Sequence, residues 1–419
     1  MIYKIEERPP FKELIAYALQ MLLAVFVASV LIANLCGVDT GAALVGAGCG
    51  TLIYILCTKA KSPMFISNSG NFVAPVILAL GIAGYAGVLI GGATTCIIYC
   101  IFGIIFSKIP VDNIYKVFPP ALIGAVTVVI GITLMGFIPG YLGETGQWGT
   151  SIALITAVII ALISHYAKGM VKVLPFLLGI LSGYIIAAIL TFTNICQLVD
   201  FSIFKSIHII QMPNFAFSNL HFDITSASLI TIIIIYACYS ISQLCECLSD
   251  HAALGGIIEI DLYRNPGLSR IFIGEGLSNL IASAVGGLGA TSYGEGIAVV
   301  GFSKVASVWV SGTAAVMLAL LGFIGPIQTF IASIPACVFA GAAIILYGYI
   351  AASGIKMLQK VDLNDNKSLV LTAATLSIGI GGLVIGSADF AITGTALALV
   401  MGIIINLVLQ DDRTNKKSN

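Results

Sequence analysis

Long apolar stretches alternate with short polar segments along nearly the whole chain. Most of the stretches approach or exceed the ~20 residues that a helix needs to cross a bilayer. The pattern therefore predicts an all-α protein that crosses the membrane about fourteen times. The expected spans are 13–36, 41–58, 64–83, 85–107, 119–138, 150–167, 173–194, 228–258, 267–287, 290–303, 305–324, 332–355, 367–385 and 389–409.

The composition agrees with a surface that faces lipid. Of the 419 residues, 59% are hydrophobic and 9% are charged, whereas a soluble domain carries about 25% charged residues. The formal net charge of zero argues against a nucleic-acid partner. The ten cysteines lie mostly within apolar stretches and lack metal-ligand spacing, so we expect small core residues rather than disulfides. We expect neither a metal nor a cofactor.

The distribution of basic residues predicts which ends of the spans face the cytoplasm. If the N-terminus is cytoplasmic and the spans alternate, 18 of the 19 Lys and Arg residues fall on the cytoplasmic side. Only Lys205, between spans seven and eight, falls outside. We therefore expect a multi-pass protein of the cytoplasmic membrane with both termini inside. The 18 residues are Lys4, Arg8, Lys12, Lys59, Lys61, Lys108, Lys116, Lys168, Lys172, Arg264, Arg270, Lys304, Lys356, Lys360, Lys367, Arg413, Lys416 and Lys417.

Three segments of the first half recur in the same order in the second half, at nearly one offset. Seven spans per copy is an odd number, so the second copy enters the membrane from the opposite side. This predicts two inverted seven-span repeats, residues 1–210 and 211–419, an architecture common among secondary transporters. The matching pairs are Gly70–Val76 with Gly294–Val300, Leu89–Thr95 with Trp309–Ala315, and Phe118–Ala125 with Pro335–Ala342.

Spans three and ten begin with small and polar residues. Span three starts with SNSGNFVAP (Ser67–Pro75), and span ten with GLGATSYGEGIA (Gly287–Ala298). An interrupted span is tolerated where it lines a cavity, and the N-terminus of its half-helix then points N–H groups at a ligand. We predict a short extended piece followed by a half-helix in each span; the alternative is a glycine-rich packing helix.

Two carboxyl groups stand inside span eight. Glu246 and Asp250 are four residues apart, which places both on one face of a helix. A charged side chain at membrane depth costs at least ~2.5 kcal/mol, so it normally faces a polar pathway. Glu295 adds a third carboxyl at the break in span ten. We expect a functional site, against the alternative of carboxyls neutralised in a structural network.

Two further polar residues stand near these carboxyls. Glu275 lies within span nine and belongs to a proton path, to a pore rim or to an ion pair with Lys304. His251 points about 100° away from Asp250 on a helix, so we expect it to form hydrogen bonds or to pack.

Several motifs together resemble the nucleobase–ascorbate transporter (nucleobase:cation symporter-2) family, which includes bacterial uracil and xanthine permeases. The resemblance covers nearly the whole chain. It implies a core domain of spans 1–4 and 8–11, a gate domain of spans 5–7 and 12–14, paired short strands at the midplane, and a homodimer through the gate domain. The motifs are ERPPF, SNSGNFVAP, FPPALIGAV, Glu246-x3-Asp250, DLYRNPGLSR (Asp261–Arg270), TSYGEGI (Thr291–Ile297) and ILYGYIAASGI (Ile345–Ile355).

The resemblance also implies roles for individual residues. Glu246 would accept N–H donors from a nucleobase, and Glu295 would be the matching carboxylate in span ten. The backbone amides of Gly294 and Glu295 would lie close to the ligand. Gly70, Asn71 and Tyr293 complete the expected substrate-binding set.

The sequence departs from the family pattern at several of these positions. Uracil permeases carry histidine at the position of Asp250 and an aromatic residue at that of Gly70. Xanthine-type members carry acidic residues at the positions of Asp250 and Glu275, but usually glutamine at that of Glu295. The span-ten signature of the family is only partly met, because Gly296, Ala298 and Ser303 replace its asparagine, glycine and threonine.

The resemblance and the carboxyls together predict a secondary active transporter, not an enzyme. It would import a nucleobase by proton symport, with Asp250, Glu246 and Glu275 coupling the protons. Uracil is the expected substrate, and xanthine, another purine or urate is the alternative. An anion exchanger of the same fold should present cations at the two half-helix ends, which lack them here. A channel or membrane enzyme is the remaining rival, but the spans show no nucleophile–base pair or phosphate loop.

Overall fold

The computed structural model describes residues 1–108, 119–142, 146–168, 171, 174–206, 208–222, 224–387 and 390–409. Its helices are α1 (Phe11–Cys36), α2 (Thr40–Cys57), α3 (Val73–Phe106), α5 (Pro120–Met135), α6 (Ile138–Leu142), α7 (Gly146–Tyr166), α8 (Pro175–Phe192), α9 (Ser226–Ile258), α10 (Leu268–Gly286), α11 (Gly294–Ser303), α12 (Val308–Leu321), α13 (Gly325–Ala332), α14 (Ala336–Leu358), α15 (Asn366–Ile380) and α16 (Gly394–Val408). Shorter helical turns are η1 (Gly70–Phe72), η4 (Phe201–Ser206), η5 (Ala216–Asn219) and η6 (Tyr263–Gly267). The strands are β1 (Ile66–Asn68), β2 (Ala290–Ser292), β3 (Val384–Ser387) and β4 (Phe390–Thr393).

Eight helical segments among the described residues are long enough and apolar enough to cross a membrane. Three shorter apolar helices, α11, α12 and α16, accompany them. Every predicted span overlaps a helix of the structure. The protein is therefore a mostly helical, multi-pass membrane protein, while fourteen crossings related by an inverted repeat stay a prediction.

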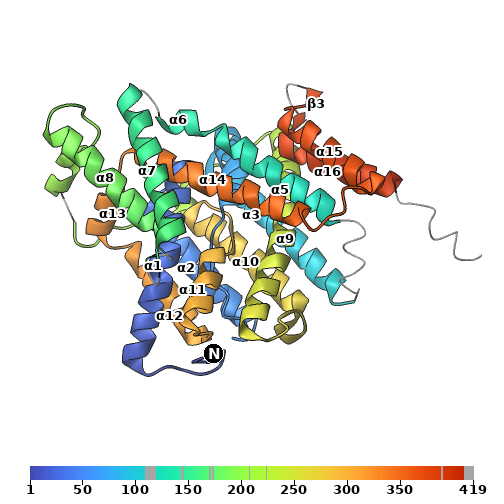
Figure 1. Cartoon of the computed structure of the whole chain (residues 1–419), viewed down its shortest axis with the longest axis horizontal. Helices are drawn as coiled ribbons and strands as arrows, with labels where there is room; N and C mark the ends of the chain where they lie inside the picture. Colours follow the sequence, from blue (N-terminus) through green and yellow to red (C-terminus); the bar gives the residue numbers. More distant parts are fainter. Residues whose placement is uncertain are drawn as a thin grey trace, which may run out of the picture.

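The helices pack in two groups; in Figure 1, α2, α10, α11 and α12 of the first lie below α5, α14, α15 and α16 of the second. In the first helix group, α10 packs on α2 and α3, α2 on α12, α3 on α9, α12 on α1, and α11 on α1 and α9. In the second helix group, α14 packs on α5, α6, α7 and α8, and α15 packs on α5 and α16. The groups meet where α1 contacts α8 and α14, and where α9 contacts α5 and α16. This division follows the expected core and gate spans, although their assignment as domains stays a prediction.

Small residues let helices of the first group approach closely. A Cβ atom added at Gly46 would lie 3.1 Å from the Ala282 carbonyl oxygen, and one at Gly50 3.2 Å from the Ser278 carbonyl oxygen. The Ser278 hydroxyl also donates to the Gly50 carbonyl at 2.6 Å. In a membrane such close packing and interhelical hydrogen bonding take the place of the hydrophobic effect. The contact between α2 and α10 thus fixes α10 beside the two short strands.

The predicted breaks in spans three and ten are present as strands followed by helices. β1 pairs with β2 in antiparallel register, with Ile66 opposite Ser292 and Asn68 opposite Ala290. Both strands are buried, and η1 with α3 follows β1 while α11 follows β2. The Asn279 side chain of α10 donates to the Ala290 carbonyl at 3.0 Å, which satisfies a buried backbone acceptor. The pairing brings the N-termini of two half-helices together.

Other boundaries differ from the sequence prediction. The expected spans 64–83 and 85–107 share α3, whose helical geometry is interrupted at Ala83 and Gly84. The expected span 367–385 ends too late and 389–409 begins too early, because β3 and β4 form a hairpin between α15 and α16. The separate short helix α13 precedes α14. Five of the residues assigned to the cytoplasmic side, Lys116, Lys172, Arg413, Lys416 and Lys417, lie outside the described residues.

Candidate functional site

One face of α9 brings polar side chains to the paired strands. The helix begins at Ser226, where the side chain of Thr225 accepts from the backbone amide of Ser228, and it runs unbroken to Ile258. Because residues three and four apart share a helix face, Gln243, Glu246 and Asp250 project in the same direction. Glu246 and Asp250 are half-buried, and Gln243 is 1% exposed.

Gln243 is the centre of the hydrogen-bond network at this face. Its side-chain nitrogen donates to Glu246 Oε2 at 2.9 Å and to the Thr291 hydroxyl at 2.8 Å. Its side-chain oxygen accepts from Asn71 at 3.0 Å and from the Ser69 hydroxyl at 3.4 Å. Asn71 also donates to Glu246 Oε2. One carboxylate oxygen of Glu246 is thus held by two amides, one from η1 and one from its own helix.

The second carboxylate, Glu295, stands in the first turn of α11 beside a cavity. The cavity has a volume of about 290 Å³, and Gly294 and Glu295 line it together with residues of α1, α8 and α14. This volume is near the lower end of the roughly 300–1,000 Å³ typical of small-molecule sites. Phe176 and Tyr349 from the second helix group form part of the wall and meet edge to face, with ring centroids 6.2 Å apart. The cavity therefore lies between the two helix groups.

The other expected binding residues surround this region in different ways. Gly294 is exposed, and a Cβ atom added there would meet nothing within 4 Å, so the α11 N-terminus is open to a ligand. Gly70 is half-buried and faces α14, where an added Cβ would lie 3.3 Å from Ile350. Asn71 is 6% exposed and bound to Glu246, and Tyr293 is buried with 6% exposure.

Asp250 is held by β2 rather than by a direct bond to Glu246. The Ser292 hydroxyl donates to Asp250 Oδ2 at 2.8 Å. The charges of Glu246, Glu275 and Glu295 all act on Asp250, and Glu295 acts on Glu246. The four carboxyls therefore stand near one another around the paired strands, and their titration as a coupled group stays a prediction.

Glu275 is part of this network and is a buried residue near the middle of α10. It is 1% exposed, and the Thr291 hydroxyl donates to its Oε2 at 3.2 Å. Its Oε1 lies 4.0 Å from Nδ1 of His251. Lys304, the ion-pair partner considered from the sequence, is exposed at the C-terminal end of α11.

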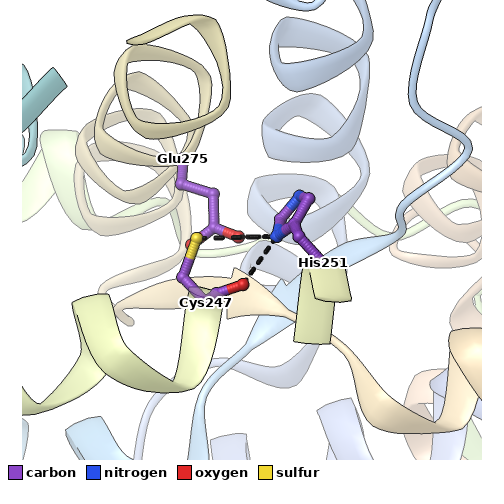
Figure 2. A group of neighbouring side chains, drawn as sticks. All are labelled: Cys247, His251 and Glu275. Carbon is purple, nitrogen blue, oxygen red and sulfur yellow. Dashed lines mark hydrogen bonds and ion pairs between the residues drawn. The ribbon is translucent and has the colours of Figure 1, made fainter. Parts of the chain in front are cut away.

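Cys247, His251 and Glu275 form a buried cluster of three different ligand types, shown in Figure 2. Their side-chain atoms lie within 4.8 Å of one another, a spacing that could hold a metal ion if an imidazole nitrogen were available. However, Nδ1 of His251 lies 2.7 Å from the Cys247 carbonyl oxygen, and Nε2 lies 2.6 Å from the Tyr54 hydroxyl. Because both ring nitrogens are engaged, we interpret the cluster as a hydrogen-bonded group.

Sequence reasoning missed several members of the network. Gln243 carried a usable signal, because it lies three residues before Glu246 and so on the same helix face. Thr291 and Ser292 belong to the motif TSYGEGI, but the motif does not predict which residues they contact. The pairing of β2 with β1 places them against α9, where they bind Gln243 and Asp250. Tyr54 is 197 residues from His251 in the chain, and no local pattern links the two.

The geometry suits a flat ligand with both donors and acceptors on its edges. Carboxylates accept from N–H groups, and the free amides at the start of α11 donate to carbonyl oxygens. The first turn of α11 carries Glu295, and η1 before α3 carries Gly70, Asn71 and Phe72, so neither half-helix begins with a cation.

Comparison with known proteins gives consistent results over nearly the whole chain. The model of a permease family, that of the xanthine and uracil permeases, matches residues 12–386. The uracil permease of Bacillus caldolyticus is 33% identical over 97% of this chain and 94% of its own length. That of Escherichia coli K12 is 32% identical over 97% of this chain and 93% of its own length.

Two solved structures show the same fold at low sequence identity. The transmembrane domain of a cyanobacterial bicarbonate transporter, BicA, has a TM-score of 0.62 at 16% identity, over 97% of this chain and 99% of that domain. The murine anion transporter Slc26a9 in its inward-facing state has a TM-score of 0.67 at 10% identity, over 96% of this chain and 69% of that protein.

Proposed function

The chain belongs to the nucleobase–ascorbate transporter family of permeases, and we propose that it imports a nucleobase, uracil first, across the cytoplasmic membrane by proton symport. The observation that carries the proposal is the half-buried carboxylate of Glu246, which Asn71 and Gln243 hold on α9, a helix that packs against α11. The uracil permeases that cover nearly the whole chain support the choice of substrate.

The chemistry of binding follows from the positions of Glu246 and α11. Asn71 and Gln243 both donate to Oε2 of Glu246, so its other carboxylate oxygen accepts the N–H donors of the base. The backbone amides of Gly294 and Glu295 donate to a carbonyl of the base, since the first N–H groups of a helix have no partner within the helix. A neutral ligand displaces water around the carboxyls, which favours uptake of a proton by the coupled group.

The position of the cavity supports transport by movement of one helix group against the other. Gly294 and Glu295 approach the cavity from the first helix group, and Phe176 and Tyr349 from the second. A tilt between the groups would open the cavity alternately to the two sides, while the paired strands keep the carboxyls together. The first group then serves as the core domain and the second as the gate domain, through which two copies form a dimer.

Two features favour a purine such as xanthine as the second candidate substrate. Gly70 stands where uracil permeases have an aromatic residue, and Asp250 stands where they have histidine. Asp250→His tests this candidate, since a neutral histidine both donates and accepts whereas an ionised aspartate only accepts. A rise in the ratio of uracil uptake to xanthine uptake supports a role of Asp250 in specificity. An equal loss of uptake for both bases would show that Asp250 only binds Ser292 and does not select the base.

Uptake by the purified protein in lipid vesicles tests the proposed function. Radiolabelled uracil should accumulate when the outside is acidic, and a protonophore should abolish the accumulation. Competition by unlabelled uracil, xanthine, hypoxanthine, guanine and urate then ranks the substrates. Accumulation that follows a bicarbonate or sulfate gradient, with no response to nucleobases, would refute the proposal in favour of an anion exchanger.

A further inference from the structure

A cavity between α2 and α12 lies on the outer side of the first helix group. It has a volume of about 650 Å³, and its walls are mostly apolar, with Leu52 and Ile55 on α2 and Val316 on α12. Trp309, at the start of α12, also lines it. Because Trp309 is 48% exposed and Val316 is 45% exposed, this side of the two membrane helices faces lipid.

The two helices run in opposite directions, which determines where the charged lining residues lie. Near the start of α2, Gly41 approaches Gly322, which follows the end of α12. Near the end of α2, Ile55 approaches Gly312 in the first half of α12. Lys59, which lines the cavity directly after α2, therefore lies at the end of the cavity where α12 begins. The charge pattern places this end on the cytoplasmic side.

The first residues of the chain bring further charges to the same end of the cavity. The Val308 amide donates to the Ile5 carbonyl at 2.9 Å, which fixes this part of the chain beside the start of α12. Glu6 lines the cavity, and the guanidinium carbon of Arg8 lies 5.1 Å from the centroid of the Trp309 ring. Tryptophan is enriched where a span meets the lipid headgroups, so the charged end of the cavity lies at headgroup level.

Lys59 and Arg8 give this end an excess of positive charge. Both side chains are exposed, and neither forms an ion pair with another residue that the structure describes. Glu6 supplies one opposing charge, so the three side chains leave one unbalanced positive charge. A lysine after the end of a helix also interacts favourably with the helix dipole. That role explains the charge of Lys59 but not the apolar cavity beside it.

We propose that the α2–α12 cavity binds an anionic phospholipid. The phosphate of the lipid lies between Lys59 and Arg8, and one acyl chain lies along the apolar walls of α2 and α12. Basic pockets between membrane helices on the cytoplasmic side recognise anionic headgroups. A soluble anion would occupy the charged end alone and leave the apolar walls without a ligand, whereas a phospholipid matches both parts. The inference does not depend on the nucleobase or on proton coupling.

The two tryptophans of the chain allow contact with a lipid to be measured at the cavity and away from it. Trp309 lines the cavity, whereas Trp148 lies on α7 in the second helix group and is also 48% exposed. Trp148→Phe and Trp309→Phe each leave one tryptophan as the fluorescent reporter. Each protein is reconstituted in phosphatidylcholine vesicles, in which a rising fraction of the lipid is replaced by brominated phosphatidylglycerol or by brominated phosphatidylcholine with the same chains. Bromine on an acyl chain quenches a tryptophan that it contacts.

We expect a preference for the anionic lipid at Trp309 and none at Trp148. Half-maximal quenching of Trp309 should need at least about fivefold less phosphatidylglycerol than phosphatidylcholine, the factor that one unbalanced basic residue contributes near anionic lipid. For Trp148 the two lipids should agree within about twofold. Equal quenching of Trp309 by the two lipids would overturn the proposal and indicate a cavity that takes any acyl chain. An equal preference at Trp148 would also overturn it.

Lys59→Asn, made in the protein that retains Trp309, tests the assignment to the cavity. Asparagine removes the charge and tolerates the left-handed backbone of Lys59, whose φ is 53°. The preference for phosphatidylglycerol should then fall to about twofold or less, because Glu6 balances the charge that remains. Lys304→Asn is the matched control and should keep the preference. Lys304 is also exposed, has φ of 60° after the end of α11, and is not among the residues that line the cavity.

An equal loss of preference in Lys59→Asn and Lys304→Asn would assign the effect to the general charge of the surface and overturn the proposal. Unchanged preference in Lys59→Asn would overturn it as well. Arg8→Gln removes the second cation and provides an independent variant. If Lys59→Asn does not fold, Arg8→Gln decides by the same criteria.

Discussion

At the scale of single residues, the candidate site is a set of carboxyls whose neighbours come from distant parts of the chain. Glu246 is held by an amide three residues away and by Asn71 from η1, whereas Asp250 and Glu275 are held by hydroxyls of β2. The sequence alone identified the carboxyls, because a charge inside an apolar span is costly and conspicuous. It could not identify Gln243 as the centre, because neutral polar residues in a span are common and their partners depend on the tertiary fold.

Glu246→Gln tests the central carboxylate. Glutamine has nearly the same size, but it replaces one acceptor oxygen with a donor and removes the charge. A hydrogen bond to a charged group contributes about 1.5–3 kcal/mol, so we expect affinity for the nucleobase to fall roughly 10- to 150-fold. Binding of labelled uracil to the purified variant measures the change, with the exposed Glu6→Gln as control. Affinity equal to that of the parent would remove Glu246 from the binding site.

At the scale of elements, glycines and polar residues mark the places where helices break. Such residues predicted the extended pieces of spans three and ten, which are β1 and β2. The hairpin of β3 and β4 was not predicted, because its residues continue the apolar pattern of α15 and α16 and a bilayer-length criterion does not separate the two. The pairing of the first residues with the segment before α12, where the Ala306 amide donates to the Tyr3 carbonyl at 2.9 Å, was also not predicted. Backbone pairing leaves little trace in the side-chain pattern.

Gly84→Ala tests the interruption of α3. Gly84 has φ of 57° and ψ of −150°, close to a region that residues with a Cβ rarely adopt, so alanine should destabilise the protein by about 1–3 kcal/mol. Gly81→Ala is the matched control, since Gly81 is helical and a Cβ there meets nothing within 4 Å. Thermal unfolding in detergent compares the two. A midpoint for Gly84→Ala equal to that of Gly81→Ala would show that the chain does not need a glycine at this break.

At the scale of the whole molecule, the sequence predicts both a helical architecture and an orientation in the membrane, and contacts between side chains test only the first. The helices of the structure overlap all the predicted spans and pack in two groups, while the division into a core and a gate domain stays a prediction. The orientation in the membrane, however, rests on the distribution of Lys and Arg, since a set of packed helices has the same internal contacts whichever way it is inserted. The internal packing of the fold therefore does not test the orientation, which needs an experiment of its own.

Protease sites inserted at two exposed connections determine the orientation. One site is placed at Phe217–Ser218, between spans seven and eight, and the other at Asp362–Asn364, between α14 and α15. With alternating spans and a cytoplasmic N-terminus, the first site faces outward and the second inward. Protease added to intact cells should then cut only the protein that carries the site at Phe217–Ser218. In permeabilised cells the proteins with either site should be cut. Cleavage at 362–364 in intact cells would contradict the span count and, with it, the inverted repeat, since an odd number of crossings in each copy is what reverses the second copy.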